Sequence, residues 1–272
     1  MRRTVVALLV AGTAACGTTA GPVEPSPSVE PVAGLQAEVV RLRTDEAVGR
    51  RLQVRLTNTG DEAFAIGAAA LDSPGFAGLP DTAVTAQFAP GRVIDLPVPY
   101  GDPVCDADPL PAVARLTLVR PGGVAEPVRA PLSAEVLQVV HDEECAVRAV
   151  LEVVDVAVTG LAEDGDVLTG SLELTRREGD DRVRATALGR SVLVDVTAEG
   201  LPVVLDRGER AVRAPVSFTP ATCDPHVLSE TKKPYGFPLT VQVGDDDPVP
   251  VDLPLDPAQR DGLAALVQRV CA

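Results

Sequence analysis

The sequence predicts an all-β protein built from two tandem β-sandwich domains. Three observations lead to this prediction. Short segments alternate apolar and polar residues, and Gly, Asp, Asn or Pro separates them about every 8–12 residues. No long helical pattern lies between these segments, and the same arrangement occurs twice along the chain. The length of 272 residues suits two domains of ordinary size.

The first half contains seven segments of this kind. We expect strands at residues 37–43, 51–58, 63–71, 84–88, 92–98, 113–119 and 126–132. Arg120-Pro121-Gly122-Gly123 separates the last two and predicts a hairpin turn. The stretch 58–61, Asn-Thr-Gly-Asp, resembles a turn common in bacterial immunoglobulin-like modules. This resemblance implies an immunoglobulin-like sandwich.

The second half repeats the pattern. We expect strands at residues 149–158, 167–175, 182–188, 191–198, 201–205, 211–218, 237–243 and 247–253. A charged stretch at residues 142–147 separates the copies, which predicts one domain over 35–145 and a second over 146–272. One larger sandwich made of two half-units is the alternative.

Four of the five cysteines fall at matching places in the two copies. Residues 88–106 align with 205–224, each as a turn, a strand, a Pro-containing turn and Cys-Asp, and residues 127–145 align with 248–271. Four cysteines allow three pairings, and matching positions imply matching bonds. The repeat therefore predicts the disulfides Cys105–Cys145 and Cys223–Cys271.

A short helix is expected to close each sandwich, and it carries the second cysteine of each pair. In the first copy Ser133 is the expected N-cap, and in the second copy Asp256 caps with Pro257 at the first helical position. The apolar face of each helix is expected to consist of Val136, Leu137 and Val140, and of Leu263, Leu266, Val267 and Val270.

The N-terminus has the pattern of an export signal. Arg2 and Arg3 precede a short apolar run at 5–10, which is too short to cross a bilayer. The ending Ala14-Ala15-Cys16 resembles the lipobox of bacterial lipoproteins, which implies a signal peptide over 1–15 and a lipid on Cys16. An ordinary signal peptide cleaved nearby is the alternative.

Residues 16–34 contain mostly Pro, Ser, Thr, Gly and Ala and have too few large apolar side chains to form a core. We interpret them as an extended tether between the lipidated cysteine and the first strand. A terminus that is merely disordered would have the same composition. With the lipobox, this predicts an extracytoplasmic protein anchored to the cell membrane, where cysteines become oxidised.

Composition excludes several classes of function. The formal net charge of −15 disfavours binding to nucleic acids and polybasic docking to anionic lipids. The chain has no Trp, two Tyr and two His, so it has few groups for stacking on bases or for imidazole chemistry. Hydrolase, nucleotide-binding and EF-hand patterns are missing from the sequence. We predict no cofactor and no metal ion.

The densest polar stretch is CDPHVLSETKKPYGF, residues 223–237, which we name the CDPH segment. It resembles a Cys-Asp-Pro-His segment of exported actinobacterial proteins of uncharacterised function. The candidate binding residues are Asp224, His226, Glu230, Lys233 and Tyr235. A carboxylate beside an imidazole suits metal binding or proton transfer. The structural interpretation is that Asp224 caps a turn or short helix and His226 packs beside the disulfide.

The resulting hypothesis is an exported lipoprotein of actinobacterial type with tandem immunoglobulin-like modules. It acts as a non-catalytic binding or structural module of the cell envelope and contacts a protein or another envelope component. The alternative is a small-molecule or metal-binding protein, or a hydrolase, with its site at Asp224, His226 and Glu230.

Overall fold

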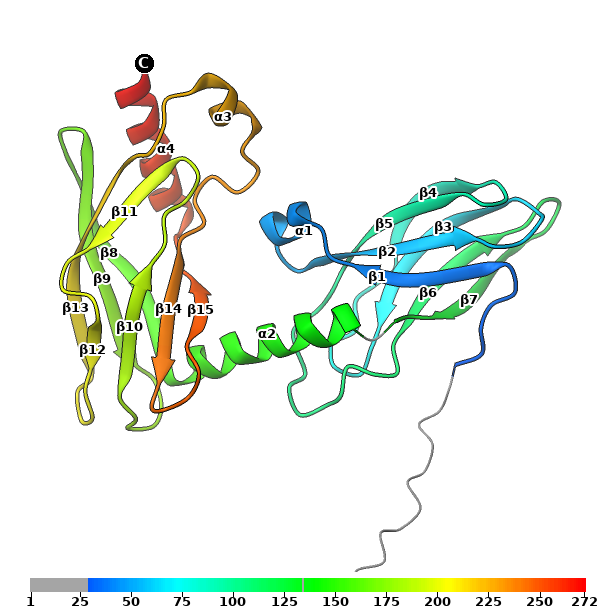
Figure 1. The fold of residues 1–272 in the computed structure, drawn as a ribbon, viewed down its shortest axis with the longest axis horizontal. Coiled ribbons are helices and arrows are strands. Elements are labelled where there is room, and N and C mark those ends of the chain that lie inside the picture. Colours follow the sequence, from blue (N-terminus) through cyan, green and yellow to red (C-terminus); the bar gives the residue numbers. More distant parts are fainter. Residues whose placement is uncertain (1–28, 134) are drawn as a thin grey trace, which may run out of the picture.

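The computed structural model describes residues 29–133 and 135–272. The predicted signal peptide, the lipidation site Cys16 and most of the predicted tether lie outside the described residues. The described chain forms two antiparallel β-sandwiches joined by a helix (Figure 1). The predicted fold class is therefore confirmed.

The first sandwich has a three-stranded sheet in the order β1-β2-β5 and a four-stranded sheet in the order β4-β3-β6-β7. The strands are β1 (Leu35–Val40), β2 (Arg51–Asn58), β3 (Phe64–Asp72), β4 (Thr82–Phe88), β5 (Val93–Pro99), β6 (Val113–Val119) and β7 (Ala125–Pro131). Their inward-facing side chains form one apolar core, in which Leu56, Phe88 and Leu118 are fully buried. The Asn58 side chain fixes the predicted turn, because its Nδ2 donates to the Glu62 and Phe88 carbonyls and its Oδ1 accepts from the Gly60 amide.

The second sandwich pairs a sheet in the order β11-β13-β9-β8 with one in the order β12-β10-β14-β15. Its strands are β8 (Val154–Asp164), β9 (Val167–Arg176), β10 (Val183–Leu188), β11 (Val194–Ala198), β12 (Val203–Leu205), β13 (Ala211–Pro220), β14 (Pro238–Val243) and β15 (Val249–Asp252). A separate core lies between the sheets, and Phe218 and Phe237 meet there edge to face with ring centroids 5.4 Å apart.

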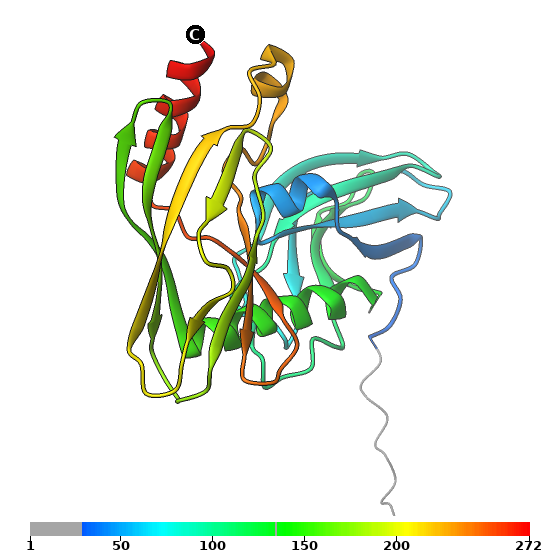
Figure 2. The ribbon, with the colours of Figure 1, turned by 60° about the vertical axis from the view of Figure 1, so that its left-hand side comes forward.

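Helix α2 (Glu135–Val153) connects the two sandwiches (Figure 2). Its 19 residues span about 29 Å at 1.5 Å per residue. Leu137 and Val140 are buried in the first core, as the sequence predicts, whereas Val150 is buried in the second. The stretch 142–147, predicted as the boundary between the copies, lies in the middle of this continuous helix.

Helix α4 (Pro257–Cys271) closes the second sandwich. Asp256 is its N-cap, with Oδ1 accepting from the Gln259 amide at 2.8 Å, and Leu263 and Leu266 are fully buried. Both predicted disulfides, Cys105–Cys145 and Cys223–Cys271, are present. Each joins the loop after a sandwich strand, β5 or β13, to the helix that follows the last strand of that sandwich, so the sequence repeat is also a structural repeat.

Prolines protect three sheet edges. Strand β5 carries Pro97 and Pro99, β7 carries Pro127 and Pro131, and β15 carries Pro250. Each strand lies at the edge of its sheet, and the two prolines within β5 and within β7 alternate with residues that pair inward. Proline has no N–H, so these positions face away from the neighbouring strand. Another chain therefore cannot pair regularly along these edges.

Two local predictions are wrong. Residues 41–43 were expected to continue the first strand, but β1 ends at Val40 and helix α1 (Arg43–Val48) begins three residues later. Residues 149–153 were expected in a strand, but they form the last turn of α2. At residues 149–153 tertiary contacts outweigh the β preference of Val, because Val150 is buried in the second core as part of the helix. At residues 41–43 the chain leaves the strand because Asp45 accepts from the Leu42 amide and starts α1 there.

Within the part of the chain that the structure describes, no helix has the length and apolar character needed to cross a membrane.

Candidate functional site

The CDPH segment begins with a structural aspartate. Asp224 is the N-cap of helix α3 (Pro225–Glu230), and its Oδ1 accepts hydrogen bonds from the backbone amides of His226 and Val227 at 2.8 and 3.3 Å. Pro225 occupies the first helical position, where a missing N–H costs nothing. The capping role expected from the sequence is confirmed.

Among the described residues, no hydrogen bond or ion pair joins the side chains of the other candidates of this segment to one another. His226 and Glu230 are exposed, Lys233 forms an ion pair with Asp252, and Tyr235 packs half-buried against the second core. Burial raises the pKa of the Tyr235 phenol. Among the described residues, no three His, Cys, Asp or Glu side chains are grouped to hold a metal ion.

The expectation that the His226 ring packs beside the disulfide is wrong, because this side chain is exposed. We expect His226→Ala to change the melting temperature by less than about 2 °C, since exposed side chains contribute little to stability. Differential scanning calorimetry of the two proteins measures this. A loss of several degrees would show that the ring makes contacts that its exposure conceals.

Lys233 lines a hollow of about 700 Å³ between the two sandwiches. We name it the junction hollow. Its first wall is the segment around α1 together with Tyr100, and its floor is the middle of α2. Its second wall consists of the turn before β15 and the outer face of β14 and β15, where Lys233 and Asp252 pair. These four regions are far apart in sequence, and Figures 1 and 2 both show α1 above α2 on the side facing the second sandwich.

A buried carboxylate holds the first wall. Asp45 is 1% exposed and accepts hydrogen bonds from the Leu42 amide, from Arg51 Nε at 2.8 Å and from Gln53 Nε2 at 2.6 Å. It therefore fixes the start of α1 and ties it to β2. A buried carboxylate with this many donors is compensated, whereas an unpaired one would be strongly destabilising.

The floor is joined to the first wall by charged and phenolic groups. The Tyr100 hydroxyl donates to Glu144 Oε1 at 2.7 Å, and Arg41 pairs with Glu143 at 2.5 Å and with Glu46 at 3.5 Å. Burial of the Tyr100 ring, followed by its hydrogen bond to the Glu144 carboxylate, raises the pKa of the phenol well above its usual range. Both effects favour the neutral phenol.

The two tyrosines allow this effect to be measured. Both phenols have raised pKa values, so their contribution to stability is complete below about pH 10, the unfolded value, and is lost as the pH rises through the folded-state pKa. We expect absorbance at 295 nm to show less tyrosine ionisation in the folded protein near pH 10 than in guanidinium, with Tyr100 accounting for most of the difference. In Tyr100→Phe only Tyr235 titrates, so the difference between this variant and the wild type gives the titration of Tyr100. A normal titration of two phenols in the folded protein would contradict the burial of Tyr100.

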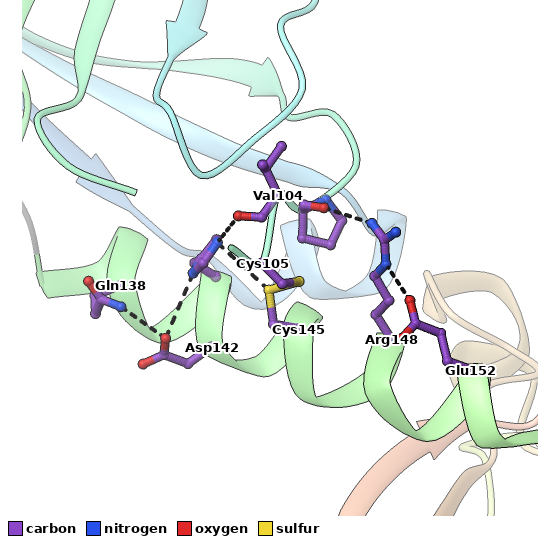
Figure 3. Close-up of a disulfide and its surroundings, with 9 residues drawn as sticks. Val104, Cys105, Gln138, Asp142, Cys145, Arg148 and Glu152 are labelled. Atoms are coloured by element: carbon purple, nitrogen blue, oxygen red, sulfur yellow. Dashed lines mark hydrogen bonds and ion pairs between the residues drawn. A yellow bond between two sulfur atoms is a disulfide. The ribbon is translucent and has the colours of Figure 1, made fainter. Parts of the chain in front are cut away.

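The floor is also covalently attached to the first sandwich (Figure 3). Cys145 of α2 is bonded to Cys105, and the neighbouring His141 is buried with Nε2 at 3.2 Å from the Val104 carbonyl. One turn beyond Cys145, Arg148 donates to the Pro103 carbonyl at 2.9 Å and pairs with Glu152. The loop after β5 therefore follows α2 for about two turns.

A second hollow, of about 400 Å³, adjoins the first along α2. The two share Arg50, Glu144 and Val147. Arg50 pairs with Asp102, and Val147 is half-buried in the floor. Of the residues predicted as candidates, Lys233 alone lines the junction hollow. The other lining residues had no signal in the sequence, because the hollow exists only when both sandwiches are in place.

Comparisons with known proteins identify no family. No family model matches the chain, and no curated protein matches it. One similar solved structure is red sea bream transglutaminase, with 12% identity and a TM-score of 0.23, covering 83% of this chain and 32% of that one. Another is the YadV chaperone, with 13% identity and a TM-score of 0.21, covering 81% of this chain and 98% of that one. A third is a Porphyromonas gingivalis W83 protein of unknown function, with 14% identity and a TM-score of 0.18, covering 82% of this chain and 100% of that one. This chain thus spans about a third of the transglutaminase, and we draw no functional conclusion from these matches.

Proposed function

We propose that this protein is a lipid-anchored, extracytoplasmic module that binds a protein or another component of the cell envelope and does so without catalysis. The observation behind this proposal is the junction hollow, which two sandwiches form around one shared helix. Helix α2 is bonded to the first sandwich through Cys145 and enters β8 of the second sandwich directly after Val153. A hollow with fixed walls is suited to recognition, because little ordering is needed on binding.

The location proposed is supported by two separate features. Both disulfides need an oxidising compartment, which in bacteria lies outside the cytoplasm. The N-terminal sequence with Ala14-Ala15-Cys16 supports export and acylation. The alternative of a catalytic or metal site at Asp224, His226 and Glu230 has no comparable support, because Asp224 caps α3 and the other two side chains are exposed.

Anchoring is tested by the mass of the processed chain. We expect protein extracted from membranes to begin at Cys16 and to carry an added acyl mass, and we expect Cys16→Ser to be released into the medium. Intact-mass spectrometry of both fractions measures this. Wild-type protein that is released with an unmodified mass would contradict the lipid anchor.

Binding is tested with a photo-crosslinking amino acid placed at Glu46, an exposed position of α1 that lines the junction hollow. The control position is Val124, which is 86% exposed in the turn between β6 and β7. We expect irradiation of whole cells to give a discrete adduct from position 46 and no such adduct from position 124. The same result at both positions, or no adduct at 46, would contradict a binding role for the hollow.

A further inference from the structure

The two adjoining hollows form an elongated space along α2. Their α2 residues run from Glu143 to Glu152, which is nine steps of the helix or about 14 Å. An extended polypeptide covers this distance with about four residues at 3.3 Å each. The space therefore has the length of a short extended peptide segment.

Along the outer edge of β15, a backbone carbonyl can accept a hydrogen bond, but the prolines there have no N–H to donate. Pro250 pairs with Thr240 and has no N–H, so its carbonyl faces outward from the sheet, and Pro248 also lacks an N–H just before the strand. The hydrogen bond from the Leu253 amide to the Phe237 carbonyl confirms that the alternate residues face inward. An occupant cannot add a regular strand here and must be held mainly by its side chains.

The charges of the junction hollow leave an excess of carboxylates. Of its described lining side chains, six are carboxylates and four are cations. Each cation pairs with a neighbouring carboxylate: Arg41 with Glu143, Arg50 with Asp102, Arg51 with Asp45, and Lys233 with Asp252.

Two lining carboxylates form no ion pair among the described residues, one in the floor and one in the second wall. Glu144 of the floor accepts from the neutral Tyr100 hydroxyl, and Asp247 of the second wall is exposed. In the adjoining hollow, by contrast, three cations face three carboxylates. The unpaired negative charge is therefore concentrated at the junction.

We propose that the junction hollow binds an extended peptide segment of a partner protein that carries Lys or Arg side chains, and that these side chains pair with Glu144 and Asp247. This inference rests on the proposed function and specifies its ligand. The half-buried Val147 and the prolines of the second wall provide an apolar surface for the aliphatic stems of Lys and Arg. The net charge of −15 attracts a cationic partner over longer distances.

The test is an NMR titration of the processed, ¹⁵N-labelled chain in neutral detergent with three capped pentapeptides, Ala-Lys-Ala-Arg-Ala, Ala-Glu-Ala-Glu-Ala and Ala-Ser-Ala-Ser-Ala. We expect the basic peptide alone to shift the backbone amides of Ala146, Val147 and Val249. Glu144→Gln and Asp247→Asn should each weaken its binding at least fivefold. Asp245→Asn is the matched control, because it removes an exposed carboxylate of the same turn that does not line the junction hollow.

Two results would overturn the inference. One is a basic peptide that binds no better than the Ser peptide, and the other is wild-type affinity in both Glu144→Gln and Asp247→Asn. An adduct from position 46 together with either result would overturn the basic ligand and leave the binding function standing. Failure of the crosslink and of the basic peptide together would contradict both.

Discussion

Replacing Cys105 and Cys145 together with Ser is expected to lower the free energy of unfolding of the first sandwich by about 4 kcal/mol. The bond closes a chain segment of 40 residues, and its loss restores the conformational entropy of that loop in the unfolded state. Because the same bond attaches α2 to the loop after β5, we also expect greater freedom between the two sandwiches. Guanidinium denaturation measures the first effect, and small-angle X-ray scattering measures the second.

The second disulfide provides the control for this experiment. Cys223→Ser with Cys271→Ser opens a loop of similar length, 48 residues, and should cost about the same free energy in the second sandwich. It does not involve α2, so the scattering curve should stay that of the wild type under native conditions. Equal scattering from both double variants would show that the first disulfide does not hold the angle between the sandwiches.

Asp45→Ala is expected to lower the free energy of unfolding by about 3 kcal/mol. The substitution leaves Arg51 Nε, Gln53 Nε2 and the Leu42 amide without their acceptor. Breaking a buried ion pair typically costs about 3–5 kcal/mol, and the lower end applies because water still reaches part of the Arg51 side chain.

The neighbouring Glu46 is a matched control for this substitution. Its side chain lies on the same short helix, is about half exposed and pairs with Arg41 at 3.5 Å. Glu46→Ala should therefore cost about 0.5 kcal/mol or less, as exposed ion pairs do. Urea denaturation of the two variants makes the comparison. Similar losses for both would show that the burial of Asp45 does not matter to stability.

The two sandwiches and their disulfides could be predicted from the sequence because the local strand and turn signals agreed with the internal repeat. Alternating strands with turn residues such as Asn58 and Gly60 predicted the elements, and matching positions selected one of three cysteine pairings. Helix α4 was recognisable from Asp256 and Pro257, which act locally. These features depend on residues close together in sequence or on comparison of the two copies.

Features that depend on contacts between distant segments were not predictable. Residues 149–153 have a β-type composition, but Val150 is buried in the second core as part of α2. Helix α1 has no Ser, Thr, Asp or Asn at its N-cap, Leu42, and is held by contacts of Asp45 with β2. The junction hollow combines four segments that are distant in sequence, so no local pattern indicates it. The sequence-based functional prediction therefore falls on the CDPH segment, where polar residues are densest.

Because α2 runs directly into β8, the number of residues in α2 determines how the second sandwich is oriented relative to the first. No residue separates Val153 from Val154, where the helix ends and the strand begins. Each residue of an α-helix turns the chain by about 100° and advances it by about 1.5 Å. One inserted residue in α2 would therefore rotate the second sandwich by more than a quarter turn around the helix axis, and α1 would then face a different side of it. The length of α2 therefore determines which surface of the second sandwich faces α1 and the first sandwich.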